Sequence, residues 1–373
     1  MFDFGALSRS PDVEAENLYA ADAADRLILD EAAEAIDAAQ RLAVVGDAYG
    51  ALTLGAAALH GSTGIRTFQD ALSGERALAG NAARLGLEAA YAPCGLDAGL
   101  LGDADVVLLR LPRSLDALDE LAEAIARWSP PAVRVYAGGM VKHMTPAMND
   151  VLRRHLGRLD VTHARQKARV LIAAEPARTD TATWPRSRTD AATGLTVVAH
   201  GAAFAGAAVD VGTRFLLEVL DAARLGADAA IDLGCGTGVI AAWLARSRPA
   251  LHVTATDQSW AAVASARATA AANGLAERID VVREDALDDR PDASADLIVL
   301  NPPFHIGAAV HTGIAHRLFA AAGRVLAPGG ELWTVWNSHL RHRPHLERLV
   351  GPTRQVARNA TFTVTASTRS PES

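Results

Sequence analysis

The residues with the clearest chemical potential are the five that follow the apolar run ADLIVL, which are Asn301-Pro302-Pro303-Phe304-His305. Two prolines fix the backbone and remove two N–H donors, so the local carbonyl oxygens face outward unpaired. The Asn301 side-chain oxygen and the Pro302 carbonyl oxygen are then placed to accept both hydrogen bonds of one exocyclic amine. Phe304 offers a flat face for an aromatic base, and His305 is either a proton acceptor or a structural histidine. The alternative is a turn that only ends a strand.

A glycine-rich segment is the second candidate, with the sequence Asp232-Leu233-Gly234-Cys235-Gly236-Thr237-Gly238. Glycines let the backbone turn tightly and approach a ligand closely. Such a turn between a strand and a helix, at the carboxyl edge of a parallel sheet, binds nucleotide-like ligands. Dinucleotide-dependent oxidoreductases use a similar turn, but the early acid and the G-x-G-x-G spacing favour another cofactor. We predict that Asp232, Gly234, Gly236 and Gly238 bind that cofactor.

Two further acids follow predicted strands. Asp257 ends LHVTATD, where a carboxylate can accept both hydrogen bonds of a ribose diol, and Asp285 follows IDVVRE, near the expected position of an adenine amine. Each acid alone is better explained as a helix N-cap than as a ligand contact. In series with the glycine segment, both are predicted to contact the cofactor.

The elements that position these residues alternate between short β-rich runs and alanine-rich helical segments. In the second half of the chain, helices are predicted to start near Val239, Trp260 and His311. The predicted strands are 228–233, 251–256, 279–282, 295–300 and 331–336. Strand–helix alternation indicates an α/β fold with a parallel sheet covered on both faces.

The two halves of the chain share a similar series of sequence motifs. One constant offset pairs Gly46 with Gly234 and Gly50 with Gly238, and a slightly longer offset pairs ADVVLLRLPRS with ADLIVLNPPFH. We interpret this as a duplicated unit, with chance similarity in an alanine-rich chain as the alternative. Residues 173–194 lack apolar periodicity and are predicted to connect the units, with a boundary near residue 190.

Composition sets the broad class. The chain has 373 residues, 50% of them hydrophobic and 21% charged, a net charge of −7, and two cysteines. These values are those of a globular protein of two domains. No apolar run is long enough for a membrane span, and the N-terminus lacks a secretory h-region. The distant cysteines predict neither a disulfide framework nor a metal site. We expect a cytoplasmic protein that binds no metal.

Two basic runs stand out against the acidic total. The first includes Lys142, Arg153, Arg154, Arg158, Arg165, Lys167 and Arg169. The second includes Arg341, Arg343, Arg348, Arg354 and Arg358. Arginine suits bidentate contacts to phosphate, whereas the alternative is a solvated helix face.

The second unit resembles a class I S-adenosylmethionine-dependent methyltransferase, through DLGCGTGVI and NPPF. Over nearly its whole length the chain is similar to the bacterial ribosomal RNA guanine-N2 methyltransferases, through GDAYGALTL, LPRSLDAL, HGAAFAGAAVDVGTRFLLEVL and FTVTAS as well. The segment around Asp210, Val211 and Gly212 resembles the start of that family's catalytic domain, which borders the cofactor.

The resemblance implies two tandem Rossmann-like methyltransferase domains, a degenerate one at 1–190 and a catalytic one at 191–373. It implies S-adenosylmethionine as cofactor, ribosomal RNA or a ribosomal subunit as partner, and methylation of a guanine N2 amine. In the first unit Val44 replaces the acid, Ala48 the middle glycine, and Arg110 the asparagine. Because arginine has no accepting lone pair, this unit is predicted to hold RNA without catalysing. The alternatives are methylation of adenine N6 or glutamine N5, and a non-catalytic assembly factor.

Overall fold

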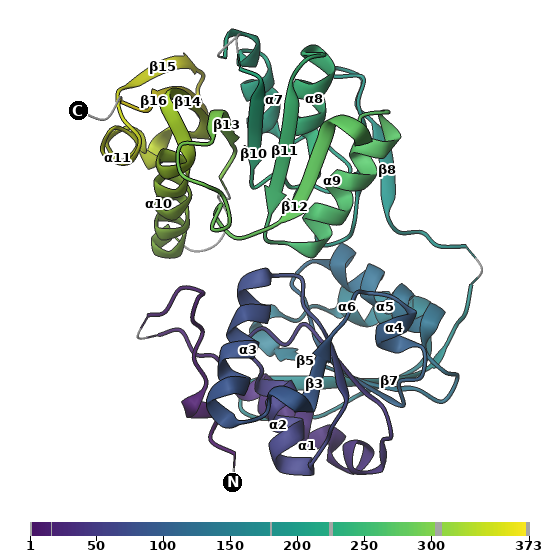
Figure 1. The fold of residues 1–373 in the computed structure, drawn as a ribbon. Coiled ribbons are helices and arrows are strands. Elements are labelled where there is room, and N and C mark those ends of the chain that lie inside the picture. The colour runs from purple at the N-terminus through teal and green to yellow at the C-terminus, as the bar shows by residue number, and fades with distance from the viewer. Residues whose placement is uncertain (1, 16, 180, 224–226, 303–307, 371–373) are drawn as a thin grey trace. The chain divides into compact units, whose positions relative to one another are not determined.

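The computed structural model describes residues 2–15, 17–179, 181–223, 227–302 and 308–370. The chain divides into two compact units, Met1–Trp184 and Pro185–Ser373 (Figure 1). The division lies a few residues before the boundary that the sequence suggests. Residues expected in the connection belong to strands instead: β7 covers Ala168–Pro176, and β8 covers Arg186–Thr189.

The first unit alternates strands and helices. Its helices are α1 (Ala23–Ala38), α2 (Ala51–His60), α3 (Leu72–Leu85), α4 (Ala98–Leu101), α5 (Leu115–Trp128) and α6 (Pro146–His155). Its strands are β1 (Leu42–Val45), β2 (Ile65–Phe68), β3 (Tyr91–Pro93), β4 (Val106–Arg110), β5 (Arg134–Met140), β6 (Leu156–Val161) and β7.

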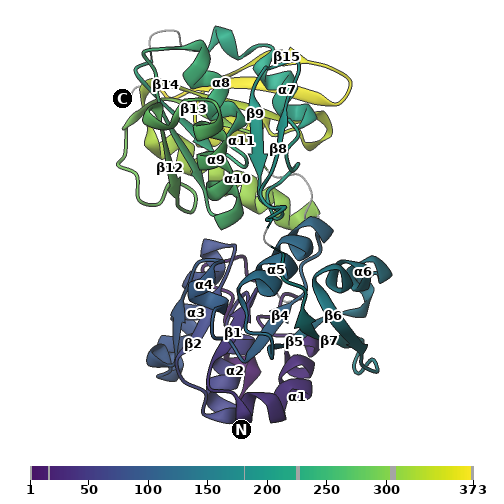
Figure 2. The same ribbon diagram turned by 90° about the vertical axis from the view of Figure 1, so that its right-hand side faces the viewer.

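The second unit begins with the hairpin of β8 and β9 (Thr196–Ala199), which lies along α9 (Trp260–Ala272) (Figures 1 and 2). The other helices are α7 (Val211–Leu217), α8 (Val239–Ser247), α10 (Ala308–Val325) and α11 (Arg343–Leu349). The other strands are β10 (Ala229–Leu233), β11 (His252–Asp257), β12 (Ile279–Arg283), β13 (Ala295–Leu300), β14 (Leu326–Asn337), β15 (Thr353–Arg358) and β16 (Phe362–Thr368).

The two main sheets share one topology. Their strand orders are β3-β2-β1-β4-β5-β7-β6 and β12-β11-β10-β13-β14-β16-β15. The register is also shared, because Val45 pairs with Leu109 as Leu233 pairs with Leu300, at the same two offsets that relate the repeated sequence motifs. In both sheets an antiparallel strand, β7 or β16, follows the parallel strands. The sequence repeat is therefore a repeat of the fold.

Both faces of the second sheet are covered, as strand–helix alternation predicts. Side chains alternate along β13, so Leu297 packs in one apolar cluster with residues of α8 and α9, and Ile298 packs in another with residues of α10. The near-continuous apolar sequence of this strand follows from burial on both sides. The carboxyl ends of β10 and β13 are left side by side, and they carry the candidate residues.

The end of the first unit is fastened to helix α5. Glu123 accepts the backbone N–H of Thr183 at 3.0 Å, and Asp119 accepts the indole N–H of Trp184 at 3.1 Å. Asp119 also accepts hydrogen bonds from Arg154 and His155. These buried carboxylates, one helical turn apart, make Trp184 the last residue of the first unit.

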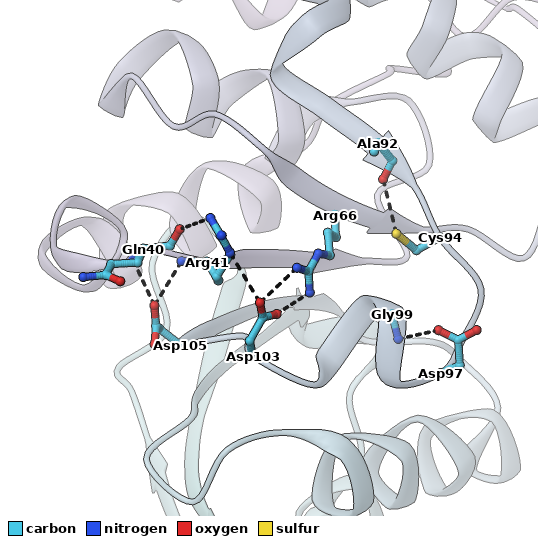
Figure 3. A network of polar contacts seen from close by, with 9 residues as sticks. All are labelled: Gln40, Arg41, Arg66, Ala92, Cys94, Asp97, Gly99, Asp103 and Asp105. Atoms are coloured by element: carbon cyan, nitrogen blue, oxygen red, sulfur yellow. Dashed lines mark hydrogen bonds and ion pairs between the residues drawn. The ribbon is translucent and has the colours of Figure 1, made fainter.

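Figure 3 includes polar contacts at the amino ends of β1, β2 and β4 in the first sheet. Asp105 accepts the backbone N–H groups of Gln40 and Arg41, and Arg41 and Arg66 both point toward Asp103. These contacts tie the starts of β1, β2 and β4 together.

Both cysteines, Cys94 and Cys235, are free. Among the helices of the described residues, none is long and apolar enough to cross a membrane.

Candidate active site

The glycine segment connects β10 to α8 as a tight left-handed turn. Gly234, Gly236 and Gly238 have φ of 67°, 53° and 75°. A Cβ on Gly236 would meet nothing within 4 Å, whereas one on Gly238 would lie 2.9 Å from the Ala266 Cβ on α9. Gly238 is therefore required for helix packing, and Gly236 borders open space that can cradle a ligand.

Asp232 lies inside the unit, below the glycine turn. Its side chain is fully buried, and its Oδ2 accepts the backbone N–H of Ala241 in α8 at 2.9 Å. Among the described residues its Oδ1 has no hydrogen-bond partner. Burial raises the pKa of Asp232 to about 7, with a smaller contribution from the charge of Asp257. The carboxyl thus fixes the start of α8 and keeps one free acceptor below the turn.

Asp257 ends β11 beside the same turn. Its Oδ2 accepts the backbone N–H of Gly236 at 3.1 Å, and its Oδ1 accepts that of Ser259 at 2.9 Å, before α9. The structure brings Asp257 and the glycine turn together. The capping role that the sequence left as an alternative belongs to Ser259, whose side chain accepts the Ala262 N–H at 3.1 Å as the N-cap of α9.

Asp285 is held in an ion pair that the sequence did not reveal. The carboxylate is 3% exposed, and both of its oxygens accept hydrogen bonds from the Arg317 guanidinium of α10, one of them at 2.9 Å. Each carboxylate oxygen keeps a second lone pair. A cofactor amine would therefore share Asp285 with Arg317.

Asn301 follows β13 at the sheet edge, directly beside the glycine turn. Leu300 pairs with Leu233 in the sheet, and its Cδ1 lies 4.0 Å from the position of a Cβ on Gly234. The Asn301 Nδ2 donates to Asp210 Oδ2 at 3.1 Å and to Thr213 Oγ1 at 2.9 Å. Among the described residues its buried Oδ1 has no hydrogen-bond partner. Pro302 is buried, whereas Phe304 and His305 lie outside the described residues.

Asn301 thus presents an unused acceptor beside a glycine cradle, at the edge where sheet topology places ligands. This arrangement fits a nucleotide-like cofactor and an amine that donates a hydrogen bond. Sequence reasoning named the segment of Asp210 but not its contact with Asn301, and it missed Thr213 and Arg317. The sequence repeat held a signal, because the offset that pairs Gly46 with Gly234 also pairs Asp22 with Asp210, and both acids cap a helix.

In the first unit the corresponding places are filled by its own side chains. Arg110, at the end of β4, donates to Asp22 and Asp25 with N···O distances of 2.6 to 2.7 Å. Asp47 in the loop after β1 is buried and accepts the N–H groups of Gly50 and Thr53, while Gln69 donates to the Asp47 carbonyl. This edge offers donors in an ion pair instead of a free acceptor.

Comparison with known proteins agrees with this geometry. The family model for the methyltransferase small domain matches residues 194–366, and that for the RLMG N-terminal domain matches residues 2–178. The fold is also that of the 16S rRNA N2 G1207 methyltransferase of T. thermophilus, with a TM-score of 0.72 and 23% identity over 88% of each chain. That structure was solved in complex with AdoMet and guanosine.

Curated relatives extend the match over almost the whole length. The ribosomal RNA large subunit methyltransferase G of Pseudomonas paraeruginosa is 36% identical, with 96% of each chain covered. The protein of the same name from Pseudomonas aeruginosa is 37% identical, again with 96% of each covered. The two units are a degenerate and an intact copy of the Rossmann-like methyltransferase fold, and the chain belongs to the ribosomal RNA large subunit methyltransferase G family.

Proposed function

We propose that this chain transfers a methyl group from S-adenosylmethionine to the exocyclic N2 amine of a guanine in large-subunit ribosomal RNA. Family membership supports the reaction and the RNA. The observation that carries the choice of an amine is the buried Asn301 Oδ1, which lacks a partner among the described residues at the edge of the glycine cradle. A cytoplasmic location follows from this substrate.

The cofactor is held by the second unit. The backbone at Gly234 and Gly236 leaves room for it, Asp257 binds the ribose, and Asp285 accepts the adenine amine beside Arg317. Asp232 supports the turn from below. S-adenosylmethionine supplies an activated methyl group on a sulfonium, so the protein contributes chiefly orientation and electrostatics.

The target amine is activated by hydrogen bonding. Guanine N2 is a weak nucleophile because its lone pair is delocalised into the ring. The amine donates one hydrogen bond to Asn301 Oδ1 and one to the Pro302 carbonyl oxygen. These two hydrogen bonds favour a pyramidal nitrogen whose lone pair points at the methyl group. Phe304 stacks on the base, which must leave its helix or be unpaired already.

The first unit serves the reaction by holding RNA. Among the described residues, Arg110 places paired N–H donors where the second unit has the Asn301 acceptor, so the first unit does not catalyse. Of the basic run, Arg153 and Arg158 are exposed, and within the described part of the chain they pair with the exposed Asp150 and Asp160. Such pairs are weak, so phosphate groups can replace the carboxylates.

The test is Asn301→Ala, because it removes the free acceptor and leaves the cradle intact. The methylation rate should fall by a factor of at least about 100, while the Kd for S-adenosylmethionine changes little. Activity is measured with labelled cofactor on large-subunit RNA, and the cofactor Kd by calorimetry. The exposed Asn17→Ala should behave like the parent.

Two results would overturn the proposal. An unchanged rate in Asn301→Ala would remove the role of Asn301. Label found in protein, or on adenine after digestion of the RNA to nucleosides, would replace guanine N2 by another amine.

A further inference from the structure

The orientation of the Asn301 amide is set by two residues of another element. Both N–H groups of Asn301 are directed at oxygens near the start of α7, Asp210 Oδ2 and Thr213 Oγ1. An amide has one accepting and one donating end. With the donating end occupied, only Oδ1 is left for a ligand.

The partners are themselves fixed. Asp210 is the N-cap of α7, and its Oδ2 accepts the backbone N–H groups of Gly212 at 2.9 Å and Thr213 at 3.2 Å. A Cβ on Gly212 would lie 3.2 Å from the Phe362 ring of β16, so the cap is packed closely against the sheet. The Asp210 oxygen is therefore held in place before any substrate binds.

The reversed orientation of the Asn301 amide is disfavoured both by Asp210 and by the incoming amine. A flip that exchanges the amide oxygen and nitrogen would put the Asn301 oxygen against the Asp210 carboxylate, where two acceptors repel. It would also direct two N–H donors at an incoming amine, which is itself a donor. The Asp210 carboxylate further polarises the amide, and this strengthens the acceptor at its other end.

In the first unit, two side chains at the corresponding helix start also hold one residue at a strand end, but that residue is an arginine. Asp22 and Asp25, which the sequence repeat aligns with Asp210 and Thr213, hold Arg110, and Asp22 also caps its helix. In each unit the start of this helix thus holds a side chain at the carboxyl end of a parallel strand, Arg110 at the end of β4 and Asn301 directly after β13. In the second unit that residue has a free acceptor.

We propose that Asp210 and Thr213 are positioning residues that fix the Asn301 amide, so that the site accepts only a hydrogen-bond donor such as an exocyclic amine. This inference rests on the proposed function. It adds the groups that select an amine over a ring nitrogen, whose lone pair would face the Asn301 oxygen.

The first test replaces the Thr213 hydroxyl by a methyl group. Thr213→Val should lower kcat about tenfold, the usual effect of one lost hydrogen bond, with the KM for RNA and the Kd for cofactor unchanged. Thr213→Ser keeps the hydroxyl and should restore most of the rate. In an Asn301→Ala background, Thr213→Val should have no further effect, because the two residues act as one unit.

The second test exchanges donor and acceptor. Asn301→Asp places two carboxylates together and should abolish most activity. Adding Asp210→Asn restores a donor–acceptor pair and leaves a free carboxylate oxygen for the amine, so the double variant should regain at least about tenfold over Asn301→Asp.

Thermal unfolding of every variant separates misfolding from misorientation. Additive effects of Thr213→Val and Asn301→Ala, or no rescue in the folded exchange variant, would overturn the positioning role. These outcomes are distinct from failure of the proposed function, in which the parent chain itself does not methylate RNA.

Discussion

At the scale of single residues, Asp232 is fully buried, and no cation among the described residues pairs with it. Burial raises its pKa from 3.8 to about 7. The folded chain therefore keeps a proton on Asp232 at pH values where the unfolded chain has released it. This stabilises the fold fully below about pH 4, and the contribution is lost as the pH rises toward 7.

Asp232→Asn should remove that pH dependence, because an amide retains the contact with the Ala241 N–H and does not ionise. The melting temperature of the variant relative to the parent should rise between pH 5 and pH 8, as followed by circular dichroism. The exposed Asp228→Asn serves as a control and should run parallel to the parent. Parallel profiles for Asp232→Asn as well would contradict the raised pKa.

At the scale of elements, the glycines of the turn between β10 and α8 have two different roles, helix packing and ligand access, which the G-x-G-x-G pattern alone does not distinguish. Gly238 permits close packing of α8 on α9, whereas Gly236 faces open space. Gly274, after α9, has a similar φ of 69° and nothing within 4 Å of its Cβ position. The pair Gly236 and Gly274 therefore distinguishes backbone strain from ligand contact.

Gly236→Ala and Gly274→Ala should destabilise the fold equally, by about 1 kcal/mol, since each forces a side chain into left-handed backbone. Only Gly236→Ala should weaken cofactor binding, about tenfold or more, because its methyl group enters the cradle. Calorimetric titration with S-adenosylmethionine measures the difference. Equal affinities of both variants would show that the cofactor does not approach this turn.

Elements of the second unit were largely predictable, since each is encoded locally. Helices begin at Val239 and Trp260 as expected, and β13 has the predicted bounds. The helix expected near His311 begins at Ala308. Contacts between distant segments were not predictable: Arg317 reaches Asp285 from 32 residues away, and Asp210 lies 91 residues before Asn301. The spacing of apolar residues predicts local helices and strands, and it carries no information on polar contacts between distant segments.

At the scale of the whole molecule, an acidic chain that binds RNA needs local positive charge. The net charge is −7. The arginines of the basic run in the first unit differ in whether they pair with a buried or an exposed carboxylate. Arg154 supports the buried Asp119 that fastens Trp184, so it is part of the fold. Arg153 and Arg158 pair with exposed carboxylates, and their side chains are 54% and 64% exposed.

Arg153→Glu and Arg158→Glu should each weaken RNA binding and reduce the slope of log affinity against log salt by about 1, as loss of one phosphate contact requires. Arg41→Glu is the matched control, because Arg41 is similarly exposed, is paired with Asp103 (Figure 3), and directly precedes β1, which β4, β5 and β7 separate from the β6 strand of Arg158. Binding of labelled large-subunit RNA at several salt concentrations gives the slopes. Identical slopes for all three variants would contradict a specific role for the basic run.

The locked ion pair of the first unit also limits how that unit can evolve. Arg110→Asn alone would strand two neighbouring carboxyls, Asp22 and Asp25, without the cation that neutralises them. Asp25→Thr alone would deprive a largely buried guanidinium of one of its two partners. Each single step toward an amide acceptor therefore removes part of this ion pair. An amide acceptor at position 110 would therefore require coupled substitutions within this ion pair.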